Sequence, residues 1–281
     1  MPADAETSRR TQTVRDAVTE GERRLQDAGC ETPRLDADLL LAHALGCERE
    51  ALYREPERPL QGDERAGYEA LLRRREAREP VAYITGRKAF RHIELHIDER
   101  VLVPRPETEL LVEVGLELPR GARVVDVGTG SGVVALALKY ERPDLDITGV
   151  DYDPNVLEVA RGNAQRLGLD VAFRHSDLLE GTAGDFDAVL ANLPYIDPDE
   201  LPDLYPEIRA EPRTAVLADE HGLALIRRLA GQLDGTPLVG LEAGRGQAER
   251  VREILRGAGF AHVETRIDLY GIERVFIGRR A

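Results

Sequence analysis

Val124-Val125-Asp126-Val127-Gly128-Thr129-Gly130-Ser131-Gly132 is the stretch of sequence that decides the fold. An apolar run at 123–127 predicts a buried strand, and the three alternating glycines lie on the turn into a helix predicted at 131–140. Backbone can approach a ligand closely at such a turn, although glycine-rich turns also serve dinucleotide sites or are simply tight turns. Because Val133 occupies the sixth position of the dinucleotide fingerprint, where glycine or alanine is expected, the sequence disfavours a dinucleotide.

Strand and helix patterns alternate downstream of this turn. Further strands are predicted at 146–150, 171–175, 186–191, 237–242, 261–267 and 273–278, and helices at 154–167, 219–233 and 247–257. Alternation of this kind predicts an α/β fold, in which a mostly parallel sheet carries helices on both faces. Ligands of such open sheets bind at the carboxyl ends of the strands.

The residues upstream of the sheet predict a small helical domain. Apolar residues recur at helical spacing between positions 14 and 78, which indicates a helical bundle. Its clearest helix begins at Thr32-Pro33 and ends at Gly46, and a second runs from about 63 to 78. The three arginines at 73–75 are interpreted as a solvated face, with a docking surface for an acidic partner as the alternative.

A β segment joins the helical part to the sheet. Apolar and polar residues alternate over 90–98, which predicts a half-exposed strand. His92, Glu94 and His96 could in principle bind a metal, but a polar strand face is expected and no metal site is predicted. The expected domains are a helical domain at 1–85, a β-hairpin linker at 86–105 and the sheet domain at 106–281.

The composition argues against several classes of protein. The chain has 281 residues, enough for two domains, and its net charge of -14 argues against binding nucleic acid through the phosphates. No apolar stretch reaches the roughly 18 residues that a membrane span needs, and the N-terminus is polar rather than a signal sequence. We expect a soluble cytoplasmic protein in which Cys30 and Cys47 are reduced thiols.

Polar residues follow the predicted strands at the edge where a ligand would bind. Asp151 follows the strand at 146–150, and an acid there can accept both hydroxyls of a ribose. Asp177 and Leu178 follow the third strand, where a carboxylate can accept from an adenine amino group beside an apolar wall. Each acid alone is more often a cap or turn residue, but with Asn192 after the fourth strand the pattern predicts one common cleft.

Asn192-Leu193-Pro194-Tyr195 closes the apolar strand at 186–191. An amide nitrogen is a poor nucleophile because its lone pair is delocalised into the carbonyl group. An Asn side-chain oxygen and a main-chain carbonyl can both accept from an NH2 group, while an aromatic ring packs over the flat acceptor. The segment therefore points to methyl transfer onto an amide or amino nitrogen, with a simple strand-ending turn as the alternative.

Several segments together carry a family resemblance. They lie at 80–86, 103–109, 126–132, 192–195, 211–212 and 268–274. With these segments the chain closely resembles the release factor glutamine methyltransferases, the PrmC/HemK family of class I S-adenosylmethionine-dependent methyltransferases. The proline-rich segment at 103–109 and the run at 268–274 are more diagnostic than the glycines, which all class I methyltransferases share.

The resemblance implies a class I methyltransferase Rossmann-like sheet, a methyl donor and an acceptor. The donor would be S-adenosylmethionine, and the acceptor would be the glutamine of the Gly-Gly-Gln loop in bacterial class I peptide chain release factors. The helical domain would help to dock that protein. The implied cofactor-binding residues are Gly128, Thr129, Gly130, Ser131 and Gly132 beside the methionine part, Asp151 on the ribose, Asp177 and Leu178 around the adenine, and Asn192.

The same resemblance makes Asn192 and Tyr195 the catalytic residues and extends the substrate site over Leu193 and Pro194. The Asn192 side chain and the main-chain carbonyl of residue 193 would accept the amide hydrogens, while the Tyr195 ring packs on the glutamine. The family motif is Asn-Pro-Pro-Tyr, so Leu193 is a departure. Leucine also supplies a main-chain carbonyl, but it lacks the fixed backbone angle of proline, which would loosen the loop.

Other acceptors and a non-enzymatic role are the alternatives. A glutamine of a ribosomal protein or an adenine amino group in DNA would suit the same tetrapeptide, although the acidic balance counts against DNA. An adaptor that binds S-adenosylmethionine and a translation factor without catalysis is the alternative from another class. The presence of Asp151, Asp177, Asn192 and Tyr195 argues against that adaptor.

Overall fold

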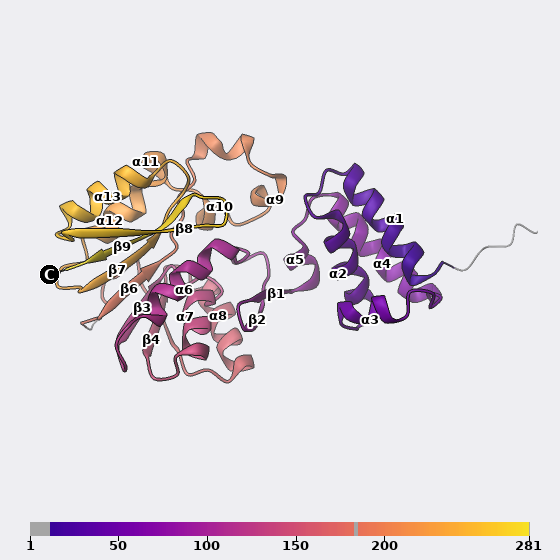
Figure 1. The fold of residues 1–281 in the computed structure, drawn as a ribbon, viewed down its shortest axis with the longest axis horizontal. Coiled ribbons are helices and arrows are strands. Elements are labelled where there is room, and N and C mark those ends of the chain that lie inside the picture. The colour runs from indigo at the N-terminus through magenta and orange to yellow at the C-terminus, as the bar shows by residue number, and fades with distance from the viewer. Residues whose placement is uncertain (1–11, 183–184, 281) are drawn as a thin grey trace, which may run out of the picture. The chain divides into compact units, whose positions relative to one another are not determined.

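Helices with apolar inner faces surround one core in the first of two units, Met1–Thr85, and the second unit is Gly86–Ala281. The computed structural model describes residues 12–182 and 185–280. The helices of the first unit are α1 (Val14–Asp27), α2 (Pro33–Leu45), α3 (Arg49–Arg54), α4 (Gly62–Glu76) and α5 (Val81–Thr85). The predicted helical bundle is thus present, and Figure 1 shows α1, α2 and α4 packed along one another.

The ends of α2 follow the predicted signals in part. Gly46 takes the left-handed conformation that ends the helix, with φ at 61°. Thr32 stands at the N-cap position, but its hydroxyl donates to the Asp36 carboxylate at 2.8 Å instead of capping the helix. The interpretation of the arginines at 73–75 as a solvated face is wrong for Arg75. Its side chain is buried, and its Nε donates to Asp36 Oδ2 at 2.7 Å, since a buried guanidinium requires a paired carboxylate.

The second unit begins with an antiparallel hairpin of β1 (Arg87–Phe90) and β2 (Ile93–His96). Ile93 and Leu95 are buried while Glu94 is exposed, as the alternation predicted. The predicted strand at 90–98 begins later than expected, because Arg91 turns the chain with φ at 48°. Within the described residues, no group of three or more His, Cys, Asp or Glu side chains could hold a metal ion.

A mixed sheet forms the centre of the second unit. Its strands stand in the order β5-β4-β3-β6-β7-β9-β8, and those from β3 to β7 pair in parallel, whereas β9 is antiparallel to both β7 and β8. The strands are β3 (Arg123–Val127), β4 (Asp146–Asp151), β5 (Ala172–His175), β6 (Ala188–Ala191), β7 (Leu238–Glu242), β8 (His262–Ile267) and β9 (Glu273–Arg279). The predicted mostly parallel sheet is confirmed.

Helices cover both faces of this sheet (Figure 1). On one face pack α6 (Glu109–Leu116), α7 (Val133–Glu141) and α8 (Pro154–Leu167); on the other pack α12 (Ala224–Ala230) and α13 (Ala248–Gly257). Val125, Val189 and Val239 share a core with α12 and α13, whereas Gly240 faces the side chains of α6. Alternate residues of each strand thus face opposite layers, as the pleat requires.

The connection between β6 and β7 is long and contains only short helices. They are the 3-10 helix η2 (Pro198–Asp203), α9 (Pro206–Arg209), α10 (Arg213–Val216), α11 (Asp219–Gly222) and α12, the last of which packs on the sheet. The helix predicted at 219–233 is therefore interrupted, because Glu220 and His221 have φ values of 56° and 58°. Among the residues that the structure describes, none of the helices has the length and apolar character needed to cross a membrane.

Candidate active site

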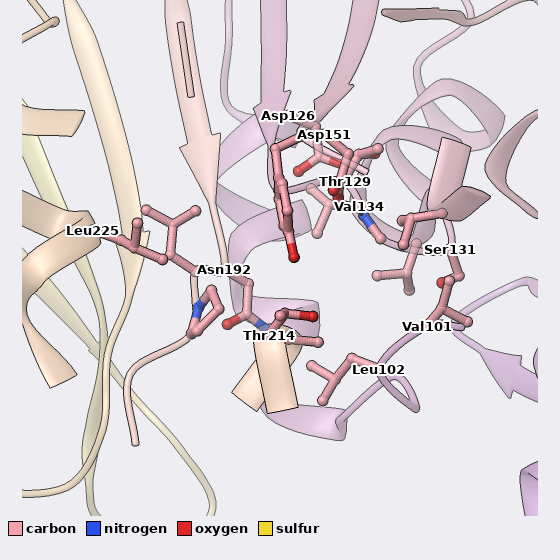
Figure 2. A pocket seen from close by; sticks show the side chains of 18 of the residues that line it. Val101, Leu102, Asp126, Thr129, Ser131, Val134, Asp151, Asn192, Thr214 and Leu225 are labelled. Carbon is pink, nitrogen blue, oxygen red and sulfur yellow. Dashed lines mark hydrogen bonds between the residues drawn. The ribbon is translucent and has the colours of Figure 1, made fainter. Parts of the chain in front are cut away.

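A cavity of about 540 Å³ opens at the carboxyl ends of β3, β4 and β6. Figure 2 shows side chains reaching into it from these strand ends, with Asp126, Thr129 and Asp151 near one another and Asn192 at another part of the wall. The segment before α6 supplies a further wall, which includes Val101 and Leu102. The parallel order of the strands places their carboxyl ends at one edge, so residues far apart in the sequence meet there.

The glycine turn after β3 lines the cavity with Gly128, Thr129, Gly130 and Ser131. Gly128 has φ at 70°, and a Cβ on it would lie 3.1 Å from Leu193 Cδ2, so this residue allows the two strand ends to pack closely. Below the turn, the buried Asp126 accepts from Thr129 Oγ1 at 2.6 Å and from the backbone N–H of Ala135 at 3.2 Å. Those bonds fix the turn against α7.

Of the three glycines in the turn, Gly132 alone does not line the cavity that the described residues form. It has φ at 83° and precedes α7. A Cβ on it would lie 2.9 Å from Leu136 Cδ1 and 3.2 Å from the Phe173 ring. Its contribution to the site is therefore structural, because it lets α7 start close to β5.

Asp151, at the end of β4, presents a carboxylate of fixed orientation to the cavity. Its Oδ2 accepts from the backbone N–H of Gly130 at 3.1 Å, and its Oδ1 accepts from that of Asp153 at 3.2 Å. Burial raises the pKa of this carboxyl, while the two backbone donors oppose that effect. Both oxygens retain acceptor capacity, since each carboxylate oxygen has two lone pairs.

Ser131, Asp177 and Leu178 also line the cavity. The Ser131 hydroxyl is buried and has no hydrogen-bond partner among the described residues, so a polar ligand group would provide one. Asp177 is exposed, and its Oδ2 accepts from Arg228 at 2.7 Å. Leu178 is buried beside it and has φ at 54°, which turns its side chain toward the core.

Asn192 and the two residues that follow it form the part of the wall next to the glycine turn, because β6 pairs with β3. The Asn192 amide nitrogen donates to Thr108 Oγ1 at 3.0 Å. That bond commits one end of the amide, so the oxygen is the end that can accept from a ligand. Leu193 is buried and packs in the core between the sheet and α12, and Pro194 follows at the cavity wall.

Tyr195 does not line the cavity among the described residues. Its hydroxyl lies 3.3 Å from Oε1 of Glu242, the last residue of β7, and its carbonyl accepts from Gln247 Nε2 at 2.8 Å. Burial raises the pKa of the Tyr195 hydroxyl, and the nearby Glu242 carboxylate acts in the same direction. The structure thus brings together every residue proposed from the sequence except Gly132 and Tyr195.

Several residues of the site were not singled out from the sequence. Thr108 holds Asn192, and Arg105 pairs with both oxygens of the buried Glu211 at 2.7 and 2.8 Å. Burial raises the pKa of Glu211 to about 7, although Arg105 favours its charged form. These residues lie in the segments at 103–109 and 211–212, which are part of the family resemblance. Which residue pairs with which, however, depends on the folded chain.

Two family models match the chain. The model described as "PrmC N-terminal domain" matches residues 16–86, and "Methyltransferase small domain" matches residues 106–208. A release factor glutamine methyltransferase from Koribacter versatilis is 40% identical over 278 residues, which is 95% of this chain and 99% of the relative. One of the same description from Deinococcus radiodurans is 39% identical and covers 95% of this chain and 99% of its own length.

A solved structure extends the likeness to the fold. A methyltransferase from Pyrococcus furiosus superimposes with a TM-score of 0.54 at 18% identity, covering 69% of this chain and 92% of that one. The likeness at this identity concerns the sheet and its helices. The cavity described above lies at the carboxyl edge of the same sheet.

Proposed function

This chain belongs to the release factor glutamine methyltransferase family, and we propose that it methylates the glutamine of the Gly-Gly-Gln loop in class I peptide chain release factors. Membership makes it a protein-glutamine methyltransferase, and the family implies S-adenosylmethionine as the methyl donor. The observation that carries the proposal is the meeting of the glycine turn, Asp151 and Asn192 in one cavity. The proposed cofactor pocket and the Asn192 oxygen proposed to bind the amide would thereby be adjacent.

The cofactor half of the cavity fits S-adenosylmethionine in size and in its donor set. A volume of about 540 Å³ falls within the roughly 300–1,000 Å³ typical of small-molecule sites. Asp151 would accept from the ribose hydroxyls, and the unpartnered Ser131 hydroxyl would bond the polar methionine end. Gly128, Thr129 and Gly130 would border that end, with Gly132 supporting the turn from behind, and Asp177 with Leu178 would bracket the adenine.

The acceptor half would hold the glutamine amide by its two hydrogens. The Asn192 oxygen and the main-chain carbonyl of Leu193 would each accept one of them, and Pro194 would shape the wall. Tyr195 lies behind this wall with its hydroxyl 3.3 Å from Glu242 Oε1, so packing of its ring on the acceptor would require the segment after Pro194 to shift when the substrate binds. We propose Asn192 and Tyr195 as the catalytic residues.

Positioning would provide most of the rate enhancement. Bound S-adenosylmethionine supplies an electrophilic methyl carbon on a positively charged sulfur. Holding the amide nitrogen about 3 to 3.5 Å from that carbon and in line lowers the barrier, since it removes most of the entropy cost of the encounter. Positive charge that developed on the amide nitrogen during methylation would be stabilised by the two accepting oxygens, those of the Asn192 side chain and the Leu193 main chain. The nitrogen then loses a proton to solvent.

The protein partner is proposed from the family and the helical unit. The relatives are described as acting on release factors, and the "PrmC N-terminal domain" model matches the helical part at 16–86. We propose that residues 1–85 form a docking domain, that 86–105 form a linker and that 106–281 form the transferase domain. A cytoplasmic location follows from such a partner, and neither a nucleic acid nor a membrane is expected to bind.

A labelling assay with several acceptors tests the proposal. The protein is incubated with labelled S-adenosylmethionine and a class I release factor, the same factor with its Gly-Gly-Gln glutamine replaced, ribosomal proteins or DNA. We expect label only in the unsubstituted release factor. Label in ribosomal protein or in DNA would identify a different acceptor, and cofactor binding without any labelling would favour the adaptor.

The variant Asn192→Ala tests the role of the tetrapeptide. We expect transfer to be abolished while the fold and cofactor affinity persist, because the lost atoms serve mainly the acceptor. Asn155→Ala is the matched control, since Asn155 is exposed at the start of α8 and its side chain hydrogen-bonds to Asp153 and to no other described residue. Parental activity in Asn192→Ala would overturn the assignment.

A further inference from the structure

Gln247 stands at the N-cap position of α13 and contacts the acceptor segment, which comprises residues 192–195. Its Oε1 accepts from the backbone N–H of Gly244 at 2.7 Å. Its Nε2 donates to the carbonyl oxygens of Tyr195 at 2.8 Å and His221 at 2.9 Å. Gln247 does not line the cavity that the described residues form, so it would act on a ligand only through other residues.

The three partners fix the orientation of the Gln247 amide. A backbone N–H can only donate and a carbonyl can only accept, so Oε1 faces Gly244 and Nε2 faces the two carbonyls. The NH2 group has two hydrogens, and each carbonyl receives one of them. An amide rotated by half a turn would lose all three bonds. One side chain thus links the loop after β7, the acceptor segment and the turn at 219–222.

Two glycines leave room for this amide. A Cβ on Gly222 would lie 1.8 Å from the Tyr195 carbonyl oxygen and 2.5 Å from Gln247 Nε2. A Cβ on Gly244 would lie 3.1 Å from Gln247 Oε1 and 3.0 Å from Tyr195 Cδ2. Since real Cβ atoms almost never come within 3.0 Å of such atoms, a side chain at position 222 would displace both groups. The backbone on both sides is therefore shaped around the Gln247 amide and Tyr195.

The turn at 219–222 is held in an unfavourable backbone conformation. Glu220 and His221 have φ values of 56° and 58°, and Gly222 follows with φ at 77°. The left-handed region is unfavourable for residues with a Cβ, and such strain persists where the surroundings impose it. The bond from Gln247 Nε2 to the His221 carbonyl is one such restraint. Strain of this kind gathers at functional sites, and here the same amide also holds the acceptor segment.

The acceptor segment leaves the site through a second set of backbone bonds. Ile196, the residue after Tyr195, donates its N–H to the Val216 carbonyl at 3.1 Å and accepts from the Ala218 N–H at 2.9 Å. Residues 214, 215 and 217 of that neighbouring segment line the cavity. The Tyr195 carbonyl is thus held between Gln247 and the cavity wall.

The proposed acceptor contacts depend on the main chain of this segment. One of them uses the carbonyl of Leu193, and only the backbone conformation can aim a carbonyl. Leu193 lacks the fixed φ of a proline, and Pro194 has no N–H to donate, so the middle of the segment has few means of fixing itself. The segment is therefore held at its ends, by β6 before Asn192 and by the anchored carbonyl of Tyr195.

We propose that Gln247 is a positioning residue that holds the Tyr195 carbonyl and thereby aims the Asn192 oxygen and the Leu193 carbonyl at the acceptor nitrogen. This inference rests on the proposed function, in which both oxygens accept from a glutamine NH2. The anchor acts on the carbonyl, so the Tyr195 ring can shift toward a substrate while the main chain of residues 192–194 stays in place. Without the two N–H donors, the carbonyl is released and the two accepting oxygens lose their spacing.

The variant Gln247→Glu tests the inference by kinetics. It keeps the size of the side chain and the bond to Gly244, but it removes both donors. We expect it to fold, because a negative charge at the N-terminus of α13 is favourable. Both kcat and kcat/KM for the release factor should fall by about 10- to 100-fold, since small displacements of reacting groups cost factors of this size. The dissociation constant of S-adenosylmethionine should stay within about 2-fold of the parental value.

Two further variants separate the loss of the donors from the added charge. Gln247→Met removes the donors without a charge, and its kcat should also fall by about 10- to 100-fold. Gln165→Glu is the control, because Gln165 is exposed on α8 and the substitution introduces the same charge. It should keep the parental kcat. A parental kcat in Gln247→Met would assign the effect of Gln247→Glu to its charge and overturn the inference.

Amide hydrogen exchange measures the anchor without any acceptor. In Gln247→Glu the Ile196 amide should exchange at least about 10-fold faster, whereas the amides of β3 should keep their parental rates, because only a local opening is enhanced. A merely structural role would raise both rates by the same factor, which would overturn the inference. If the parental protein labels no release factor, the proposed function fails, and the Ile196 exchange rate still decides whether Gln247 anchors the segment. Parental kinetics or unchanged Ile196 exchange in Gln247→Glu would also overturn the inference.

Discussion

Leu193→Ala should separate the stability of the acceptor segment from its chemistry. The Leu193 side chain is 4% exposed, and it belongs to the core that β3, β6, β7, α12 and α13 share. Its Cδ2 also fills the space next to Gly128, where a Cβ would come within 3.1 Å of it. The proposed chemistry uses only the main-chain carbonyl of residue 193, which alanine retains.

The magnitude follows from the burial of the side chain. Replacing a buried leucine by alanine costs about 2–5 kcal/mol, and the cost rises with the volume of the cavity left behind. Leu193 also borders the ligand cavity, so the new space is continuous with an existing one. We therefore expect the lower part of the range, about 2–3 kcal/mol, which corresponds to a fall in Tm of about 5–10 °C in a unit of this size.

Denaturant unfolding and methyl transfer measure the two effects separately. At a temperature where Leu193→Ala is folded, kcat should stay within about 3-fold of the parental value, which corresponds to less than 1 kcal/mol. Leu269→Ala is the control for stability, because that leucine is 99% exposed and surface changes stay within about 0.5 kcal/mol. A loss of stability below 1 kcal/mol would refute the packing argument, and loss of transfer in folded protein would refute the main-chain role.

Two further predictions concern buried charges. Arg75→Met should destabilise the helical unit by about 3–5 kcal/mol, because it leaves Asp36 buried without its ion pair, whereas the exposed Arg73→Met should stay within about 0.5 kcal/mol in denaturant unfolding. The second concerns Glu242, because burial raises its pKa from 4.5 to about 7. The folded protein therefore binds this proton more tightly than the unfolded chain does. The resulting stabilisation is complete below pH 4.5 and is lost as the pH rises through 7. The unfolding free energy of the parental protein relative to Glu242→Gln should therefore fall by about 2–3 kcal/mol between pH 5 and pH 8, and a constant difference would contradict the raised pKa.

The parts of the site that sequence predicted are those that local patterns determine. A strand followed by a polar residue can be identified from a short window, and parallel order then brings Asp151, Asp177 and Asn192 to one edge. Alternating glycines likewise identify a turn that requires positive φ. No contact between distant segments has to be known for either inference.

Contacts between distant segments account for the errors. Arg75 stands in a run of arginines at a helix end, and only the packing of α4 on α2 brings it to Asp36. The break in the helix predicted at 219–233 arises where Gln247, from the loop before α13, binds the carbonyls of Tyr195 and His221. These partners lie far apart in sequence, so periodicity carries no information about them.

Glu242 combines both cases. A carboxyl at the end of a predicted strand is the same signal that identified Asp151, but Glu242 points behind the cavity rather than into it. Its Oε1 lies 3.3 Å from the Tyr195 hydroxyl, so it contacts the acceptor segment from behind, and that contact depends on the packing of β7 beside β6. A sequence specifies that an asparagine is present, whereas the folded chain determines which end of its amide is held, since Asn192 Nδ2 donates to Thr108 Oγ1 at 3.0 Å. The identity of the tetrapeptide at 192–195 therefore does not by itself fix the orientation of the Asn192 amide, because its partner Thr108 lies 84 residues away in the sequence.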